Sequence, residues 1–249
     1  MTLPHLSRAI TEAEAARKPR DRLSAVAEAG VRAVTLDART PGLRARELDR
    51  SARRDLAATL KRAELGLAGI DLWIPASHFV EAEHIDRAVA VGVGTIDLAA
   101  ELASLSAGDA VVHLTLPDEG GDAAARALAA AAETAGVQLA DHRWPMRSWE
   151  GPIAAGLDPA VALMEKADPV SAATSGSLVS ARVSSLGDAA MRVALDAHGS
   201  RLDVAAYRAS LSLSPLLLTL VTDVRGVHDA KAAALSALNA WEEAGQFLG

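Results

Sequence analysis

Short apolar runs alternate with segments of helical periodicity along the whole chain. The runs are rich in Val, Leu, Ile and Ala and end at Gly, Pro or a polar residue, which is typical of buried strands. They predict strands at 3–10, 33–36, 67–74, 109–116, 137–140, 152–157, 178–184 and 215–222. In the segments between them, apolar positions recur at the spacing of one helix face. These segments predict helices at 20–29, 51–64, 82–103, 123–135, 159–166, 204–213 and 229–244.

This alternation predicts an α/β fold. Strands that alternate with helices form a parallel sheet. A set of eight closes a barrel, whereas an open doubly wound sheet usually has about five or six strands. A barrel of this kind takes roughly 250 residues as one domain, and no linker or low-complexity stretch divides this chain of 249 residues. We therefore predict a single (β/α)8 barrel domain over residues 1–249.

Polar residues stand at the ends of several predicted strands. Asp37, Asp141, Asp158 and Asp223 each follow an apolar run directly, and His142 comes next to Asp141. The carboxyl ends of the strands of a parallel barrel open on one mouth, where barrel enzymes hold their active sites. These side chains are therefore predicted to meet at one site.

The composition narrows the classes of partner. The formal net charge is −7, and nucleic-acid binding needs a basic footprint, so we expect no nucleic-acid partner. The basic clusters at 17–22 and 44–54 are interleaved with acids at helical spacing, and we interpret them as solvated faces. No purely apolar run approaches the roughly 18 residues of a membrane helix, so no membrane partner is expected.

Cysteine usage bears on the chemistry and the compartment. The chain has no cysteine, which excludes disulfides, thiolate metal sites and thiol nucleophiles. This fits a reducing cytoplasm, and the N-terminus shows no signal-peptide pattern, so we expect cytoplasmic localisation. The Ala-rich helices fit both a monomer and a homodimer.

Three stretches resemble a known family. They are 29–37 (AGVRAVTLD), 136–142 (GVQLADH) and 156–159 (GLDP). Their order and spacing resemble the second, fifth and sixth strands of the xylose isomerase-like barrels, which include sugar phosphate isomerases and epimerases and the endonuclease IV relatives. The resemblance covers nearly the whole chain and implies a small substrate, such as a sugar or a sugar phosphate. The acidic balance disfavours the DNA-repair branch.

The resemblance also implies a divalent metal. In active members, Glu, Asp, His and Glu from the ends of the last four strands hold the metal at the mouth. The metal polarises a substrate carbonyl while carboxylates move a proton at the adjacent carbon. On this chain the resemblance places Asp141, Asp158 and Asp223 as ligands of Mn²⁺, Mg²⁺ or Zn²⁺.

The chain departs from that pattern on the seventh strand. Arg182 stands where the family has its histidine ligand, and Val161 stands where a histidine usually follows the sixth-strand aspartate. Arginine stays protonated and cannot bind a metal. Two interpretations stay open. In one, Arg182 takes over the charge of the metal and holds an anionic or polyhydroxy ligand. In the other, Arg182 neutralises the acids of a retired site.

Further polar and aromatic residues belong to predicted mouth loops or strand ends. We predict substrate contacts from Asp37, Trp73, His78, His113, His142, Trp144 and Arg225. Tryptophan faces stack on sugar C–H surfaces, and the loop that holds Arg225 follows the last strand, where barrels often bind phosphate.

Each of these residues also has a purely structural interpretation. Asp37 fits a turn before the Pro41–Gly42 pair, His113 fits a buried core position, and the tryptophans fit loop packing. Asp71 lies inside a predicted strand and needs a partner if it is buried, either Arg182 or a histidine.

The resulting hypothesis is an isomerase or epimerase for a small polyhydroxy or phosphorylated substrate. Asp141 and Asp158 would act as base and orienting acid, and Arg182 as anion clamp or electrophile. The alternative is a catalytically inactive barrel that binds a metabolite or a protein partner, as the missing histidine ligand favours.

Overall fold

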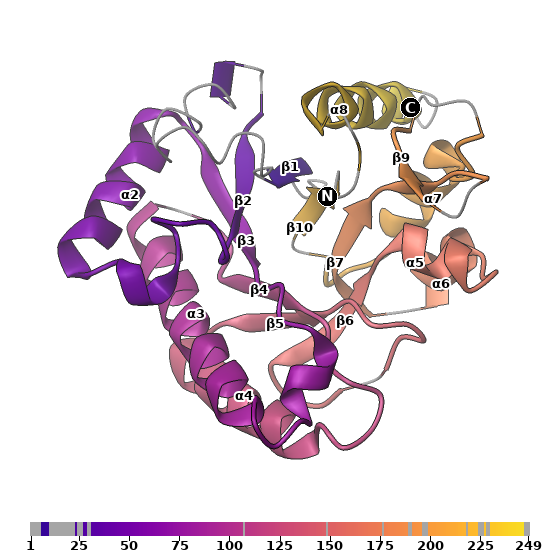
Figure 1. Cartoon of the computed structure of the whole chain (residues 1–249). Coiled ribbons are helices and arrows are strands. Elements are labelled where there is room, and N and C mark those ends of the chain that lie inside the picture. Colours follow the sequence, from indigo (N-terminus) through magenta and orange to yellow (C-terminus); the bar gives the residue numbers. More distant parts are fainter. Residues whose placement is uncertain are drawn as a thin grey trace.

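The computed structural model describes residues 6–9, 23, 27–28, 31–106, 108–147, 149–175, 177–188, 191–195, 199–217, 219–223, 227 and 230–246. Within this part of the chain, eight parallel strands form a closed barrel in the order β1-β10-β7-β6-β5-β4-β3-β2 (Figure 1). The strands are β1 (Leu6–Ala9), β2 (Ala33–Asp37), β3 (Gly66–Asp71), β4 (Val111–Leu114), β5 (Gln138–Asp141), β6 (Ile153–Leu157), β7 (Leu178–Val183) and β10 (Thr219–Thr222). The predicted α/β barrel is thus confirmed.

Helices cover the outside of the barrel. In Figure 1, α2, α3 and α4 lie along one side of the ring of strands, and α5 to α8 lie along the other. Their bounds are α2 (Arg50–Arg62), α3 (Ile85–Ser106), α4 (Asp122–Ala135), α5 (Pro159–Met164), α6 (Pro169–Ser175), α7 (Val204–Leu211) and α8 (Ala230–Gln246). The 3-10 helices η2 (Ala45–Glu47) and η3 (Ala76–Phe79) follow β2 and β3.

Local sequence explains where several of these helices begin and end. The Asp49 side chain accepts a hydrogen bond from Ala52 N at the start of α2, and the Asp158 side chain does the same with Ala160 N at the start of α5. Both use the carboxylate as an N-cap. Gly136 ends α4 with a φ of 66°, a left-handed conformation that glycine adopts without strain.

The structure adds two elements that the apolar pattern does not predict. The helix α6 follows α5, and a small antiparallel hairpin of β8 (Ser185–Leu186) and β9 (Arg192–Val193) follows β7. The predicted helix at 20–29 falls almost entirely outside the described residues. The β8–β9 hairpin matters for function because it carries Arg192 to the mouth.

The helix α3 is long and apolar enough to cross a membrane by length and composition alone. It packs on β3, β4, α2 and α4. Gly92 allows a close approach, because an added Cβ would lie 2.5 Å from Leu128 Cδ2. A single helix of this kind in the wall of a barrel is weak evidence for a membrane span, and the expected absence of a membrane partner stays a prediction.

Candidate functional site

Two guanidinium groups, one buried and one half-buried, and three buried carboxylates form a charged cluster at the carboxyl ends of the strands. Arg182 of β7 reaches Asp71 Oδ1 at 2.7 Å, Asp223 Oδ2 at 3.7 Å and Asp158 Oδ2 at 4.0 Å. Arg192 of β9 reaches Asp158 Oδ2 at 2.5 Å and Asp223 Oδ2 at 3.2 Å. We call these five residues the mouth centre.

Strand register explains how residues so far apart in sequence meet. Arg182 pairs with Val221 across β7 and β10, so Asp223 lies just beyond it. Asp158 directly follows β6, the other neighbour of β7. Asp71 is the last residue of β3, on the far side of the ring. The Arg182 side chain therefore crosses the barrel interior to reach it.

Electrostatics keep both arginines charged. Burial by itself lowers the pKa of Arg182, but the carboxylates of Asp71, Asp223 and Asp158 raise it above its ordinary value. The pKa of Arg192 is also raised: burial acts against the charge, and Asp223 and Asp158 more than offset it. The Arg182 side chain is 1% exposed. Removing one partner from such a buried network leaves an uncompensated charge, which is costly.

The residues of the mouth centre do not fit a divalent cation. A guanidinium nitrogen lies within ion-pair distance of Asp158 and of Asp223, two of the ligands that the family resemblance implies. A cation placed between these carboxylates would be repelled by the positive charges already there. This arrangement is the one expected if arginine has taken the place of a metal.

The third implied ligand, Asp141, is engaged elsewhere. Its Oδ1 accepts hydrogen bonds from the backbone N–H groups of Leu116 and Arg143, and its Oδ2 accepts one from Trp149 Nε1 at 3.1 Å. Burial raises the pKa of this carboxyl, although the three hydrogen bonds oppose the shift. Asp141 thus ties the ends of β4 and β5 to the following loop.

Two buried histidines lie next to each other beside the mouth centre, with their ring planes tilted by 46°. His113 Nδ1 lies 3.3 Å from His142 Nε2 and 3.1 Å from Ser180 Oγ. Burial lowers the pKa of His113 to about 4, so its ring is neutral near pH 7. Glycines make room for both rings, because an added Cβ at Gly69 would lie 2.4 Å from the His113 ring and one at Gly156 would lie 2.7 Å from the His142 ring.

A pocket of about 240 Å³ opens over the mouth centre. Its lining includes Trp73, His142, Trp144, Asp158 and Arg192. The Trp73 ring lies over Arg182, with the guanidinium carbon 4.6 Å from the ring centroid, which is cation–π distance. The pocket therefore combines aromatic faces, a carboxylate and a guanidinium in one small space.

The remaining predicted contact residues lie in different surroundings. Asp37 accepts hydrogen bonds from the backbone and side chain of Arg39, as a turn residue does, and it does not line the mouth pocket. His78 lies in η3 at the rim, outside the lining of that pocket. Arg225 lies outside the described residues.

The mouth residue that the sequence did not reveal is Arg192. It lies in a two-residue strand within a polar stretch, where no periodic pattern assigns a direction to its side chain. The charges at the mouth gave one indication. Three buried carboxylates outnumber the single guanidinium of Arg182, and buried charges need partners, so a second basic side chain was to be expected there.

A second cavity, of about 610 Å³, lies outside the mouth between η2, α2 and α3. Five arginines line it, at positions 39, 44, 46, 53 and 87. Arg44 pairs with Glu47 and Arg53 pairs with Glu101, at 2.9 Å each. In these pairs a carboxylate neutralises an arginine, which agrees with the interpretation of residues 44–54 as a solvated face of mixed charge.

Comparisons with known proteins address the fold. No family model and no curated protein matches the chain. A xylose isomerase domain protein from Planctomyces limnophilus matches with a TM-score of 0.73 and 16% identity over 98% of both chains. A xylose isomerase-like TIM barrel protein from Mycobacterium smegmatis, solved in complex with magnesium, matches with a TM-score of 0.71 and 13% identity over 98% of both chains.

A D-psicose 3-epimerase solved in the presence of D-fructose matches with a TM-score of 0.70 and 14% identity, over 98% of this chain and 99% of the other. At these identities the likeness shows the fold. It confirms the resemblance to xylose isomerase-like barrels that the three sequence motifs predicted.

Proposed function

We propose that the mouth pocket binds a small polyhydroxy compound, a sugar or a sugar phosphate, without a divalent metal. The observation that carries the proposal is the mouth centre itself, where Arg182 and Arg192 occupy the space between Asp158 and Asp223. The names of the structural neighbours, which include sugar epimerases and a sugar phosphate isomerase/epimerase, support a sugar-like ligand.

The pocket offers what a polyhydroxy ligand needs. Trp73 and Trp144 supply flat apolar faces against which sugar C–H groups stack. The Asp158 carboxylate accepts hydrogen bonds from hydroxyl groups, and Arg192 donates to oxygens beside it. A phosphate group on the ligand would find two further guanidinium groups beside Arg182 in the pocket lining, those of Arg143 and Arg192.

Turnover of the ligand is a second candidate function, which one observation favours. His142 lines the pocket, and its Nε2 lies 3.3 Å from Nδ1 of the buried His113. Imidazole is the side chain most often used as a general base, so His142 is the group placed to remove a proton beside a carbonyl group. In this scheme Arg182 and Arg192 stabilise the developing negative charge, Asp158 orients the substrate, and Asp141 holds the loop.

The test begins with thermal melting in EDTA against a panel of pentoses, hexoses and their phosphates, followed by calorimetric titration of each stabilising compound. A ligand that binds the folded state raises the melting temperature. We expect one class of compound to do so in EDTA and to bind more weakly to Arg192→Gln. The matched control Arg44→Gln changes an arginine outside the mouth and should leave affinity intact.

Binding that requires added metal, or that survives Arg192→Gln unchanged, contradicts the proposal. Turnover is then measured by NMR in D₂O. Incorporation of deuterium at a carbon of the bound sugar, lost in His142→Gln, supports an isomerase or epimerase. Binding without incorporation supports the inactive barrel.

A further inference from the structure

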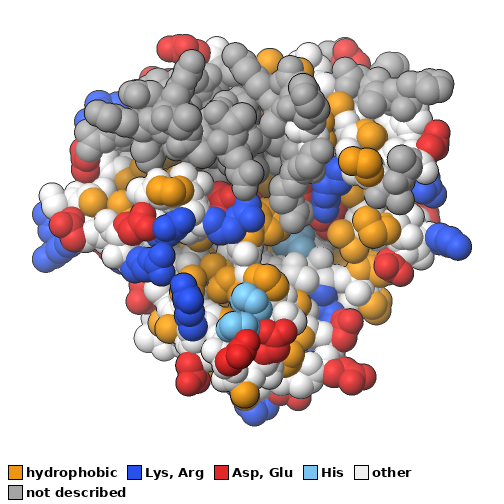
Figure 2. All heavy atoms as spheres, viewed as in Figure 1, with side chains coloured by type: hydrophobic (Ala, Val, Ile, Leu, Met, Phe, Trp, Pro, Cys, Tyr) orange, Lys and Arg blue, Asp and Glu red, His pale blue; other side chains and the backbone are white. Residues whose placement is uncertain are grey.

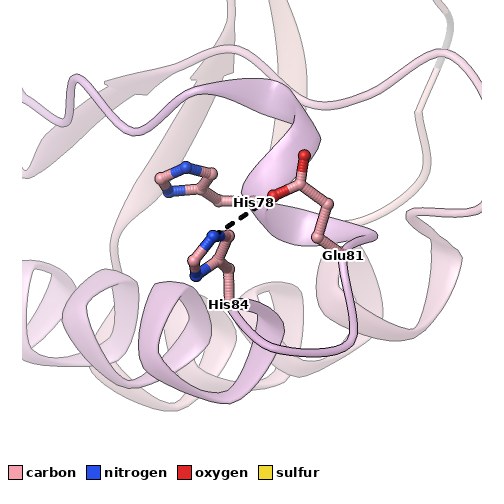
Figure 3. A group of neighbouring side chains, drawn as sticks. All are labelled: His78, Glu81 and His84. Atoms are coloured by element: carbon pink, nitrogen blue, oxygen red, sulfur yellow. Dashed lines mark ion pairs between the residues drawn. The ribbon is translucent and has the colours of Figure 1, made fainter.

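A group of metal-ligating side chains lies away from the mouth centre, in the segment between β3 and α3. One ligand atom each from His78, Glu81 and His84 lies within 4.8 Å of the other two. Figure 3 shows the two imidazole rings one above the other, with the Glu81 carboxylate turned toward His84. We call these three residues the rim cluster.

The backbone holds the rim cluster in two successive turns. Glu81 N donates to Ser77 O at 3.0 Å, and His84 N donates to Glu81 O at 2.9 Å. The fully buried Phe79 anchors the segment to the core. Because the backbone is fixed, only side-chain rotations are needed to bring the three ligand atoms onto one ion.

The distances are close to those of a metal site. Bonds of about 2.0–2.2 Å to a tetrahedral ion place neighbouring ligand atoms roughly 3.3 Å apart. His84 Nε2 already lies 3.5 Å from Glu81 Oε2, and the two imidazole centroids are 4.4 Å apart. The exposed Glu83, whose Oε1 lies 2.9 Å from His84 Nε2, is near enough to serve as a fourth ligand.

The local charge also favours a cation. Among the described residues, the ion pairs of Glu81 and Glu83 are with His84 alone, and no lysine or arginine joins them. The cluster lies at the surface, where Figure 2 shows histidine side chains directly beside acidic ones. An ion can therefore enter from solvent without breaking a buried contact.

We infer that His78, Glu81 and His84 form a binding site for a late first-row divalent cation such as Zn²⁺, Co²⁺ or Ni²⁺. Two imidazoles and one carboxylate suit these ions, whereas Mg²⁺ and Ca²⁺ prefer oxygen ligands throughout. The ion fixes the turn that carries Ala76, which lines the mouth pocket. The inference is independent of what the mouth pocket binds.

The experiment uses the full chain without an affinity tag. Zn²⁺ affinity is measured by competition with a chromogenic chelator, and Co²⁺ is added separately to record its visible absorption. We expect one ion per chain, absorption bands of a four- or five-coordinate nitrogen–oxygen site, and a rise in melting temperature. His84→Asn and Glu81→Gln should each weaken affinity at least about tenfold, since each removes one of three ligands.

The control is Glu133→Gln, which makes the same chemical change at an exposed position on α4, away from the cluster, and should leave affinity as in the wild type. Glu83→Gln, expected to weaken binding less than Glu81→Gln, tests the fourth ligand. The inference is overturned if the wild type binds no Zn²⁺, or if His84→Asn and Glu81→Gln bind as tightly as Glu133→Gln. Circular dichroism of every variant shows that a loss of binding is not a loss of fold.

Discussion

Carboxylates gather at the mouth centre and again at the rim cluster, but different side chains face them. At the mouth centre, the buried Arg182 and the half-buried Arg192 lie among Asp71, Asp158 and Asp223. At the rim cluster, histidines face the acids at the surface. A fixed guanidinium satisfies buried acids permanently, whereas an imidazole is free to exchange a proton for a metal. The mouth centre therefore holds permanent positive charge inside the barrel, whereas the rim cluster offers ligand atoms that a metal ion can reach from solvent.

The largest expected effect follows from removing the buried charge at the mouth centre. Arg182→Leu removes the guanidinium that pairs with the buried Asp71 at 2.7 Å, so we expect the free energy of unfolding to fall by about 3–5 kcal/mol. Denaturant titration measures this. Arg44→Leu, at a partly exposed ion pair, should cost no more than about 1 kcal/mol. Equal losses in the two variants would contradict a buried network of this kind.

A second prediction concerns acid stability. The pKa of His113 is lowered to about 4 from 6.5, so between pH 6.5 and pH 4 the unfolded chain binds a proton that the folded chain excludes. Stability from this group is present above pH 6.5 and is lost as the pH falls toward 4, by an amount on the order of 3 kcal/mol. His113→Gln should flatten this part of the profile, as measured by unfolding at several pH values. An unchanged slope would show that His113 is not held neutral.

A third prediction tests the space that the adjacent rings of His113 and His142 require. Gly69→Ala would place a Cβ 2.4 Å from the His113 ring, at a φ of 140° that side chains rarely adopt. We expect a loss of about 1–3 kcal/mol from overpacking. Gly94→Ala is the matched control, because its Cβ would meet only Ala45 at 3.6 Å, and in a helix this change is neutral or stabilising. Comparable melting temperatures for the two variants would refute the close approach.

The smallest expected effect concerns ligand affinity. Trp144→Ala removes one aromatic face of the mouth pocket and should weaken sugar binding by about 1 kcal/mol, roughly fivefold. Calorimetry with the compound identified by melting measures it. The same variant should leave Zn²⁺ affinity at the rim cluster unchanged, so a parallel loss of both would show that the two sites are not separate.

Much of the fold could be predicted from the sequence because it rests on local patterns. Apolar runs and the residues that end them locate all eight barrel strands to within a few residues. A buried Asp71 was also expected to have Arg182 or a histidine as its partner, and the structure places Arg182 against it at 2.7 Å. Both inferences depend on which residues are buried, and the pattern of apolar positions along the chain predicts this directly.

The arrangement of the site could not be predicted in the same way, because it depends on loops. Arg192 reaches the mouth through the β8–β9 hairpin, whose polar sequence has no periodicity. His78 and His84 come together because the chain between them folds into two successive turns. The three acidic side chains expected at one point are divided, since Asp141 turns to Trp149 while Asp158 and Asp223 share the arginines.

The most direct test is the number of Zn²⁺ ions bound per chain in the wild type, His84→Asn and Asp158→Asn. Asparagine is also a good N-cap, so Asp158→Asn keeps the start of α5. At a Zn²⁺ concentration that just saturates the wild type, the account predicts one ion in the wild type, one in Asp158→Asn and well below one in His84→Asn. Loss of the ion in Asp158→Asn together with its retention in His84→Asn would contradict the account, because it would place the metal at the mouth.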